Sequence, residues 1–297
     1  MEYSQLGKST LNISRIGFGC MSLKQEPASE ILVNDAIEKG INFFDTADLY
    51  NKGENEILVG KAIGKKRKDV IIATKGGNQW NDDGTSWRWN ASPQYLKTTV
   101  EKSLQRLGTD YIDLYQLHGG TMEDPIEEII GTFESFVQQG KIRFYGISSI
   151  RPNVIDRWLK LSQLTSVMMQ YSLLDRRPEE NCLPLLQKNK VGVLARGSLA
   201  QGVLIGKPSK EYLGHSEGSV GSVSSALQTL SSEYTPESLA TGFVLQHPAV
   251  ISAIIGMRTK EHLNQALQSI KDLPLSEKQY QTLKKMIPPN YYDQHRL

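Results

Sequence analysis

Short runs of apolar residues, each the length of a β-strand, recur along the chain and alternate with longer amphipathic stretches. Most of these runs are nearly continuous in Val, Ile, Leu, Phe and Tyr, as expected for strands buried on both faces of a parallel sheet. The eight predicted strands are 16–20, 41–45, 70–75, 111–118, 142–148, 166–172, 191–196 and 250–256.

Helical stretches with start and stop signals lie between these strands. We predict that Ser29 caps a helix ending near Gly40, and that Ser92 and Asp124, each followed by proline, cap two more. Each of these helices ends at a glycine, a usual C-terminal stop. Eight repeats of strand and helix predict an α/β fold, a closed (β/α)8 TIM barrel that forms one domain over residues 1–297.

An open, doubly wound sheet is the alternative fold. The segment after the first strand, GFGCMSLKQEPASE, lacks the G-x-G-x-x-G turn that a dinucleotide-binding unit of that kind requires. Ahead of the first barrel strand, residues 2–15 read as two short strands around Gly7 and Lys8. We therefore expect an N-terminal β-hairpin that covers one end of the barrel.

The connections after the third and seventh strands are longer than the others, and both rise from the C-terminal face of a barrel, where catalytic groups gather. The first, 76–92, carries Trp80, Trp87 and Trp89, and it either walls a substrate pocket or packs on itself. The second, 202–234, is rich in Ser and Gly. We predict that it is mobile and acts as a lid or cofactor clasp.

Charge and composition argue against several kinds of function. The 34 Lys and Arg residues against 32 Asp and Glu leave a net charge of +2, too small to predict nucleic-acid binding. The chain has no apolar stretch of membrane-spanning length and no signal-peptide pattern at its start, so we expect a cytoplasmic protein. Cys20, Cys182 and the histidines show no disulfide framework or metal-ligand spacing, and we predict no metal.

Polar residues stand at the C-terminal ends of three predicted strands, where burial is costly unless it serves a purpose. The second strand ends in Asp45, the third in Lys75 and the fourth in His118, while Tyr50 follows Asp45 after a short turn. Each residue alone has a structural explanation. Four such residues at neighbouring strand ends predict one catalytic site.

The segments around these residues resemble the aldo-keto reductase family. DTADLY, with IIATKGG and DYIDLYQLHGG downstream, forms a specific combination, and GISSIRPN, MMQYSLLDRR, LARGSLAQGVL and IIGMRTKEHL follow in the family's order. The resemblance covers essentially the whole chain. It implies a (β/α)8 barrel that binds NADPH and reduces aldehydes or ketones.

The physical chemistry of the four residues fits that activity. Carbonyl reduction needs a hydride from the cofactor and a proton for the developing alkoxide. Tyr50 is the expected proton donor, and we predict that the Lys75 ammonium lowers its pKa from about 10. Asp45 would hold Lys75 charged and oriented, and His118 would hydrogen-bond the carbonyl oxygen.

The resemblance also implies a cofactor site, with departures from the family pattern. Ser148 and Gln170 match residues that bind the nicotinamide carboxamide, but Ser149 replaces the usual Asn and Arg196 replaces an aromatic residue. Arg258 matches the ligand of the adenosine 2′-phosphate, with Lys260 as helper, while Gln265 and Ala266 replace the usual Glu and Asn. The implied cofactor-binding residues are Ser148, Ser149, Gln170, Arg196, Ser198, Leu199, Gly256, Arg258 and Gln265.

Two other functions remain open. The chain could be an NADPH-binding redox-sensing or regulatory subunit with little turnover, as some family members are. It could also be a Schiff-base enzyme that uses Lys75, although a lysine paired with Asp45 is a poor nucleophile.

Gly119 and Gly120 after His118 suggest a roomy or flexible mouth. We expect a small-molecule carbonyl substrate, no nucleic-acid or membrane partner, and a monomer or weak homo-oligomer.

Overall fold

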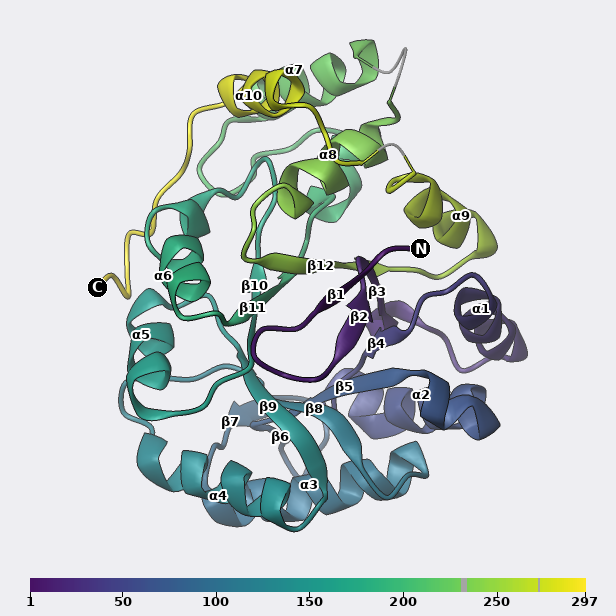
Figure 1. Ribbon diagram of the computed structural model, residues 1–297, viewed down its shortest axis with the longest axis vertical. Helices are drawn as coiled ribbons and strands as arrows, with labels where there is room; N and C mark the ends of the chain where they lie inside the picture. The colour runs from purple at the N-terminus through teal and green to yellow at the C-terminus, as the bar shows by residue number, and fades with distance from the viewer. Residues whose placement is uncertain (231–233, 272) are drawn as a thin grey trace.

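The computed structural model of the chain describes residues 1–230, 234–271 and 273–297. Within these ranges, parallel strands close into a barrel in the order β10-β11-β12-β3-β4-β5-β8-β9, and helices surround it (Figure 1). The predicted (β/α)8 barrel is thereby confirmed. Its strands are β3 (Ile16–Gly19), β4 (Phe43–Asp45), β5 (Ile71–Gly76), β8 (Ile112–Leu117), β9 (Ile142–Ser148), β10 (Ser166–Gln170), β11 (Gly192–Arg196) and β12 (Val250–Gly256).

Side chains of the barrel strands point alternately into the barrel and towards the helices. The inward-facing Phe43, Leu114 and Met168 belong to one buried apolar cluster. Their outward-facing neighbours Phe44 and Tyr115 belong to a larger cluster beneath the helices. Burial on both faces explains why the strands appear in the sequence as nearly continuous apolar runs.

The outer layer consists of the helices between successive barrel strands, with two between β11 and β12 and two after β12. They are α1 (Pro27–Glu38), α2 (Glu54–Ile63), α3 (Pro93–Leu107), α4 (Ile126–Gln138), α5 (Pro152–Leu161), α6 (Cys182–Lys188), α7 (Glu217–Thr229), α8 (Pro236–Leu245), α9 (Lys260–Gln268) and α10 (Glu277–Lys285). None of these helices, as far as the chain is described, has the length and apolar content needed to cross a membrane.

Of the three predicted helix caps, one is confirmed and two are wrong. The Ser92 side chain accepts a hydrogen bond from the Tyr95 backbone N–H at the start of α3. Helix α1 begins earlier, at Pro27, whose ring presets the φ of a first turn, so Ser29 is buried within the helix. Asp124 does not cap α4, because its carboxylate accepts hydrogen bonds from Trp89 Nε1 and the Thr121 backbone N–H.

The predicted N-terminal hairpin is present and covers the amino ends of the barrel strands. Its strands β1 (Tyr3–Gln5) and β2 (Asn12–Ser14) pair antiparallel and cross the front of the barrel in Figure 1. Leu6 and Leu11 are buried with the interior side chains of the barrel. Gly7 has a positive φ of 57°, and a Cβ there would lie 2.4 Å from the Thr165 carbonyl oxygen. Only glycine suits this close approach.

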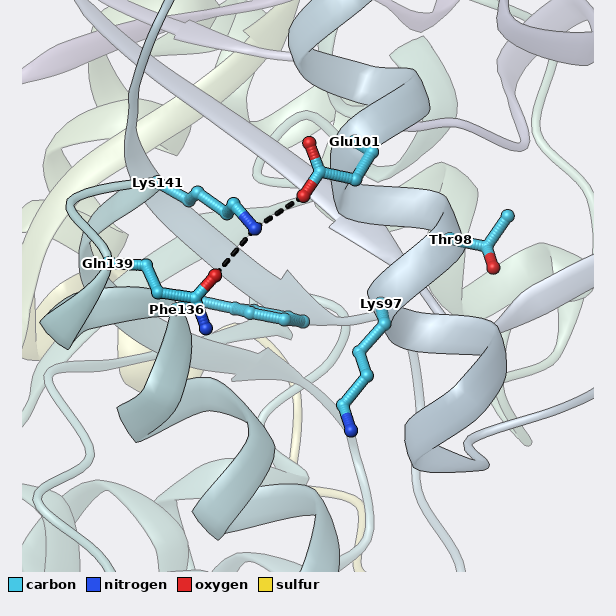
Figure 2. A pocket seen from close by; sticks show the side chains of 6 residues that line it. All are labelled: Lys97, Thr98, Glu101, Phe136, Gln139 and Lys141. Carbon is cyan, nitrogen blue, oxygen red and sulfur yellow. Dashed lines mark hydrogen bonds and ion pairs between the residues drawn. The ribbon is translucent and has the colours of Figure 1, made fainter.

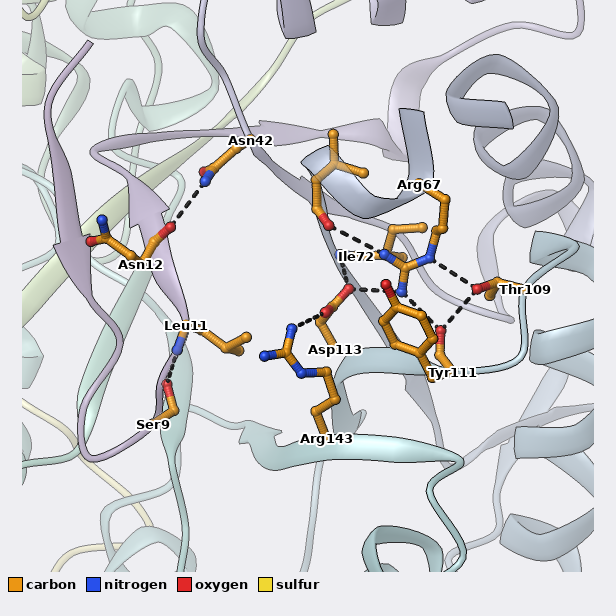
Figure 3. Close-up of polar contacts among 11 residues, drawn as sticks. Ser9, Leu11, Asn12, Asn42, Arg67, Ile72, Thr109, Tyr111, Asp113 and Arg143 are labelled. Atoms are coloured by element: carbon orange, nitrogen blue, oxygen red, sulfur yellow. Dashed lines mark hydrogen bonds and ion pairs between the residues drawn. The ribbon is translucent and has the colours of Figure 1, made fainter. Parts of the chain in front are cut away.

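A polar network lies beside the hairpin at the same end of the barrel (Figure 3). The buried Asp113 carboxylate forms ion pairs with Arg67 at 2.8 Å and Arg143 at 2.7 Å. It also accepts a hydrogen bond from the Ile72 backbone N–H at 3.0 Å. The Arg67 guanidinium stacks over the Tyr111 ring at 4.1 Å. These contacts tie the starts of β5, β8 and β9 together.

The two long connections contain regular structure. After β5 the chain forms a hairpin of β6 (Asn78–Trp80) and β7 (Trp87–Trp89). After β11 it forms a 3₁₀ helix, Ala200–Ile205, and then α7, whose Val220, Val223 and Leu227 are buried. The described part of this connection is therefore largely helical, and its role as a mobile lid or cofactor clasp stays a prediction. Residues 231–233 of that connection lie outside the described residues.

Candidate active site

The C-terminal ends of β4, β5 and β8 bring the four predicted catalytic residues together. Asp45 ends β4, Lys75 is the penultimate residue of β5, and His118 directly follows β8. Tyr50 begins a 3₁₀ turn after β4 and is only partly buried, so it lies at the mouth of the barrel. Parallel strands end at one edge, which is why residues distant in sequence meet here.

Lys75 occupies the centre of this group. Its side chain is fully buried, and Nζ lies 2.8 Å from each carboxylate oxygen of Asp45. The same nitrogen donates to the Thr46 carbonyl oxygen at 2.7 Å and to Tyr50 Oη at 3.3 Å. These three partners match the three N–H donors of an ammonium group.

The charge state of Lys75 follows from these partners. Burial alone would lower its pKa, but Asp45 and Tyr50 outweigh that effect and raise the pKa. The amine is therefore held as an ammonium group.

The predicted direction of the Tyr50 pKa is wrong. Burial raises the pKa of the phenol, and the nearby Lys75 ammonium opposes that change without cancelling it. The sequence indicated the charge of Lys75 but not the loss of water around the phenol. The site thus keeps Tyr50 protonated, which suits a group that donates a proton.

His118 lies against Tyr50 and is uncharged. The two rings meet edge to face, with centroids 5.9 Å apart. Burial lowers the pKa of His118 to about 3, and the charges of Lys75 and Arg196 act in the same direction. A neutral imidazole carries one N–H donor, so it can hydrogen-bond an oxygen atom without competing as an acid.

The predicted nicotinamide-binding residues lie at the ends of the next three strands. Ser148, Gln170 and Arg196 are the last residues of β9, β10 and β11. Arg196 donates to Gln170 Oε1 at 3.1 Å, and its charge affects the pKa of Tyr50 and His118. Ser149 is buried, and its hydroxyl accepts a hydrogen bond from the Arg151 backbone N–H.

The remaining predicted cofactor residues follow β11 and β12. Ser198 is buried and donates to the Ala195 carbonyl oxygen, while Leu199 packs against the core. Gly256 ends β12 and is exposed, as is Arg258. Gln265 is half-buried on α9. Ser198, Leu199, Gly256 and Arg258 thus lie at or just after the C-terminal ends of β11 and β12, whereas Gln265 lies further along the chain, within α9.

Tyr212 is a residue near this site that the sequence did not indicate. Its hydroxyl accepts a hydrogen bond from Gln170 Nε2 at 3.1 Å. Tyr212 lies in the long connection after β11, and no motif marks it. Only the folded path of that connection brings it to the end of β10.

The space beside the two glycines after His118 is occupied by neighbouring side chains, and the predicted roomy or flexible mouth stays a prediction. A Cβ on Gly119 would lie 2.8 Å from the Trp89 ring, and one on Gly120 would lie 2.9 Å from Val154. Trp89, from the β6–β7 hairpin, therefore fills the space beside Gly119. Its indole N–H donates to Asp124 at 2.8 Å.

Crevices on the helix layer are separate from this site. One of about 300 Å³ lies between α3 and α4, where Lys141 pairs with Glu101 (Figure 2). Another of about 350 Å³ lies between α2 and α3. Lys141 directly precedes β9, so the first crevice opens near the amino ends of the strands. Neither is lined by the four catalytic candidates.

Comparisons with known proteins agree with this geometry. A model described as the aldo/keto reductase family matches residues 15–288. The chain is 44% identical over 306 residues to YqkF of Bacillus subtilis, an uncharacterized oxidoreductase, with 100% of both chains covered. It is 32% identical over 234 residues to an NADH-specific methylglyoxal reductase of Escherichia coli, covering 72% of each chain. The holo form of the aldo-keto reductase AKR11C1 from Bacillus halodurans matches with a TM-score of 0.95, 43% identity and 100% coverage of both chains.

Proposed function

Since the chain belongs to the aldo/keto reductase family, we propose that it is an NADPH-dependent oxidoreductase that reduces aldehydes or ketones to alcohols. The observation that carries this proposal is the buried contact of Lys75 with Asp45 and Tyr50, beside a neutral His118. Such a group can deliver a proton to a carbonyl oxygen at the barrel mouth.

Each residue has a distinct part in the proposed reaction. Tyr50 donates its proton to the carbonyl oxygen as negative charge develops there. The Lys75 ammonium, 3.3 Å from the phenol oxygen, stabilises the tyrosinate that remains. His118 donates a hydrogen bond to the same carbonyl oxygen and orients it. Asp45 holds Lys75 charged and in place.

The residues at the ends of β9 to β12 fit a nicotinamide dinucleotide. Gln170 and Ser148 offer amide and hydroxyl groups that suit a carboxamide, and the planar guanidinium of Arg196 can stack on a ring. The exposed Arg258 suits a phosphate, which it can bind with two N–H groups. When bound, the reduced cofactor supplies the hydride.

The proposed preference for NADPH over NADH rests on Arg258, because the 2′-phosphate is the feature that distinguishes the two cofactors. One relative of the chain is named as NADH-specific. The two cofactors must therefore be compared directly.

Schiff-base chemistry at Lys75 is disfavoured by its contacts. An amine must lose its proton before it can attack a carbonyl, and Asp45 and Tyr50 raise the pKa of Lys75. All three of its donors already have partners.

Titration of tryptophan fluorescence with NADPH and with NADH tests the cofactor assignment. We expect micromolar or tighter binding of NADPH, weakened about tenfold or more in Arg258→Ala. Lys278→Ala is the control, because it also removes one exposed positive charge, but on α10, outside the predicted cofactor site. Equal affinity of wild type and Arg258→Ala for NADPH would contradict the assignment of Arg258.

Turnover of a panel of aldehydes tests the chemistry. We expect Tyr50→Phe to lower kcat by at least about a hundredfold and to leave NADPH affinity within about twofold, since the phenol holds the transferred proton. Unchanged turnover in Tyr50→Phe would show that the proton comes from another group. NADPH binding without turnover of any carbonyl would favour a sensing subunit instead.

A further inference from the structure

Two adjacent residues in the first turn of α2 turn their side chains to the strands of the candidate site. Asn55 and Glu56 are 1% and 0% exposed. Asn55 Oδ1 accepts a hydrogen bond from Thr46 Oγ1 at 2.6 Å, and its Nδ2 donates to the Cys20 carbonyl oxygen at 2.8 Å. Asn55 thereby joins the residue after Asp45 to Cys20, the residue after β3.

Glu56 makes the equivalent connection to β5. Its Oε1 accepts a hydrogen bond from Thr74 Oγ1 at 2.5 Å, and its Oε2 lies 2.7 Å from Arg106 Nε. Thr74 directly precedes Lys75 in the strand. One turn of α2 therefore holds the neighbours of both Asp45 and Lys75.

The short segment between Tyr50 and α2 has an unfavourable backbone conformation. Asn51, Lys52 and Gly53 have φ values of 48°, 55° and 89° in succession. Left-handed backbone is costly for a residue with a side chain such as Lys52, so it persists only where the surroundings enforce it. The segment is anchored before Tyr50 by the Asp48 backbone N–H, which donates to the Lys75 carbonyl oxygen at 3.2 Å. Asn55 and Glu56 supply the anchor after it.

We propose that Asn55 and Glu56 are positioning residues that hold the left-handed turn in place and so keep Tyr50 Oη within hydrogen-bond distance of Lys75 Nζ. Neither residue touches the reacting atoms. They act through Thr46 and Thr74, which keep α2 in register with β4 and β5. The proposal rests on the proposed role of Tyr50, and its test therefore includes a measurement made without substrate.

Thr74→Val is the sharpest variant, because valine has nearly the shape of threonine but cannot donate to Glu56. Thr74→Ser keeps the hydroxyl and is the conservative rescue. Glu56→Met has a side chain of similar length but removes both acceptor oxygens, so it tests the contacts with Thr74 and Arg106 from the other side. Asp113→Asn is the control for lost stability, because it also removes a buried carboxylate paired with arginine, but at the opposite end of the barrel.

The first measurement is an NMR titration of ¹³C-labelled tyrosine, with Tyr50 assigned by the signal missing in Tyr50→Phe. Loss of the Lys75 contact removes an effect that lowers the pKa of Tyr50. We expect this pKa to be higher by about half a unit or more in Thr74→Val and Glu56→Met than in wild type, Thr74→Ser and Asp113→Asn. A Tyr50 titration in Thr74→Val that matches wild type would overturn the proposal.

The second measurement is steady-state reduction of an aldehyde by the same proteins. Thr74→Val should lower kcat about fivefold or more, with KM and NADPH affinity within about twofold, and Thr74→Ser should restore most of it. An equal loss of kcat in Asp113→Asn would show that the loss comes from lower stability of the whole protein, and it would also overturn the proposal. If no protein turns over a carbonyl, the proposed function fails, and the tyrosine titration still decides the positioning role.

Discussion

The Asp48 side chain lies two residues before Tyr50 and is 8% exposed. Burial and the nearby Glu56 raise its pKa to about 8, against the opposing charges of Arg106 and Lys75. An aspartate in the unfolded chain ionises near pH 4. Between about pH 4 and 8 the unfolded state therefore releases a proton that the native state keeps, so stability falls as pH rises.

We predict that Asp48→Asn removes this pH dependence, because asparagine has no proton to lose. Wild type should lose stability with a slope of up to about 1.4 kcal/mol per pH unit relative to the variant. Urea unfolding of both proteins at pH 5 and pH 7.5 measures the difference. Parallel pH profiles for the two proteins would show that Asp48 is ionised in the folded protein across this range.

The low pKa of His118 leads to a second prediction at the level of a single residue. With a pKa of about 3, the imidazole stays neutral at any pH where the enzyme is assayed. The pH profile of kcat/KM for aldehyde reduction should therefore show no acid limb from His118 between pH 5 and 8. An acid limb near pH 6.5 that disappears in His118→Gln would contradict this.

At the residue scale, the sequence predicted the site residues at strand ends but missed Asn55 and Glu56, which lie on α2. Asp45, Lys75 and His118 could be found because polar side chains are conspicuous at the ends of apolar runs. Glu56 carries no such signal, since a carboxylate near a helix start usually faces water. Its burial depends on Thr74 and Arg106, which are distant in sequence.

At the scale of elements, the Trp89 side chain is one of the contacts that hold the β6–β7 hairpin, together with Asn78 and Tyr95. The Trp89 ring packs on Gly119, and its indole N–H donates to Asp124. We predict that Trp89→Ala loosens the hairpin over the mouth and raises KM for bulky apolar aldehydes about tenfold, a change of about 1.4 kcal/mol. NADPH affinity should change less than about twofold. Steady-state kinetics with large and small aldehydes measures the effect.

Trp87→Ala is the control for this prediction, because Trp87 lies on the same hairpin but is 53% exposed. It should alter KM less than Trp89→Ala does. If Trp89→Ala left KM unchanged for every aldehyde, the hairpin would be a surface feature that packs on itself. That alternative was left open by the sequence, because three tryptophans in a loop do not reveal which of them is buried.

The predictions of elements are right where one physical effect determines the structure. They are wrong where two effects compete, as at the starts of helices. Burial on both faces makes the barrel strands visible as apolar runs. The start of a helix depends on which polar side chain is free to accept a hydrogen bond from the backbone N–H groups of its first turn. Asp124 looks like a cap in the sequence, but in the fold it binds Trp89, which comes from a different connection.

At the scale of the whole molecule, the two ends of the barrel carry buried charges for different purposes. At the C-terminal end, Lys75 pairs with Asp45 beside the partly exposed Tyr50. At the amino end, Asp113 pairs with Arg67 and Arg143 beside the β1–β2 hairpin, which closes the barrel (Figure 3). In a barrel of this type, groups at the amino end serve stability, while those at the C-terminal end serve function.

This division predicts that Asp113→Asn destabilises the protein without changing its chemistry. Removing one partner of a buried ion pair leaves the arginines uncompensated, at a cost of about 3 kcal/mol. Thermal unfolding should therefore occur roughly 5–10 °C lower. At a temperature where the variant is still folded, its kcat and NADPH affinity should remain within about twofold of wild type, because Asp113 lies at the opposite end of β8 from His118. A large drop in kcat for folded Asp113→Asn would show that the two ends of the barrel are coupled.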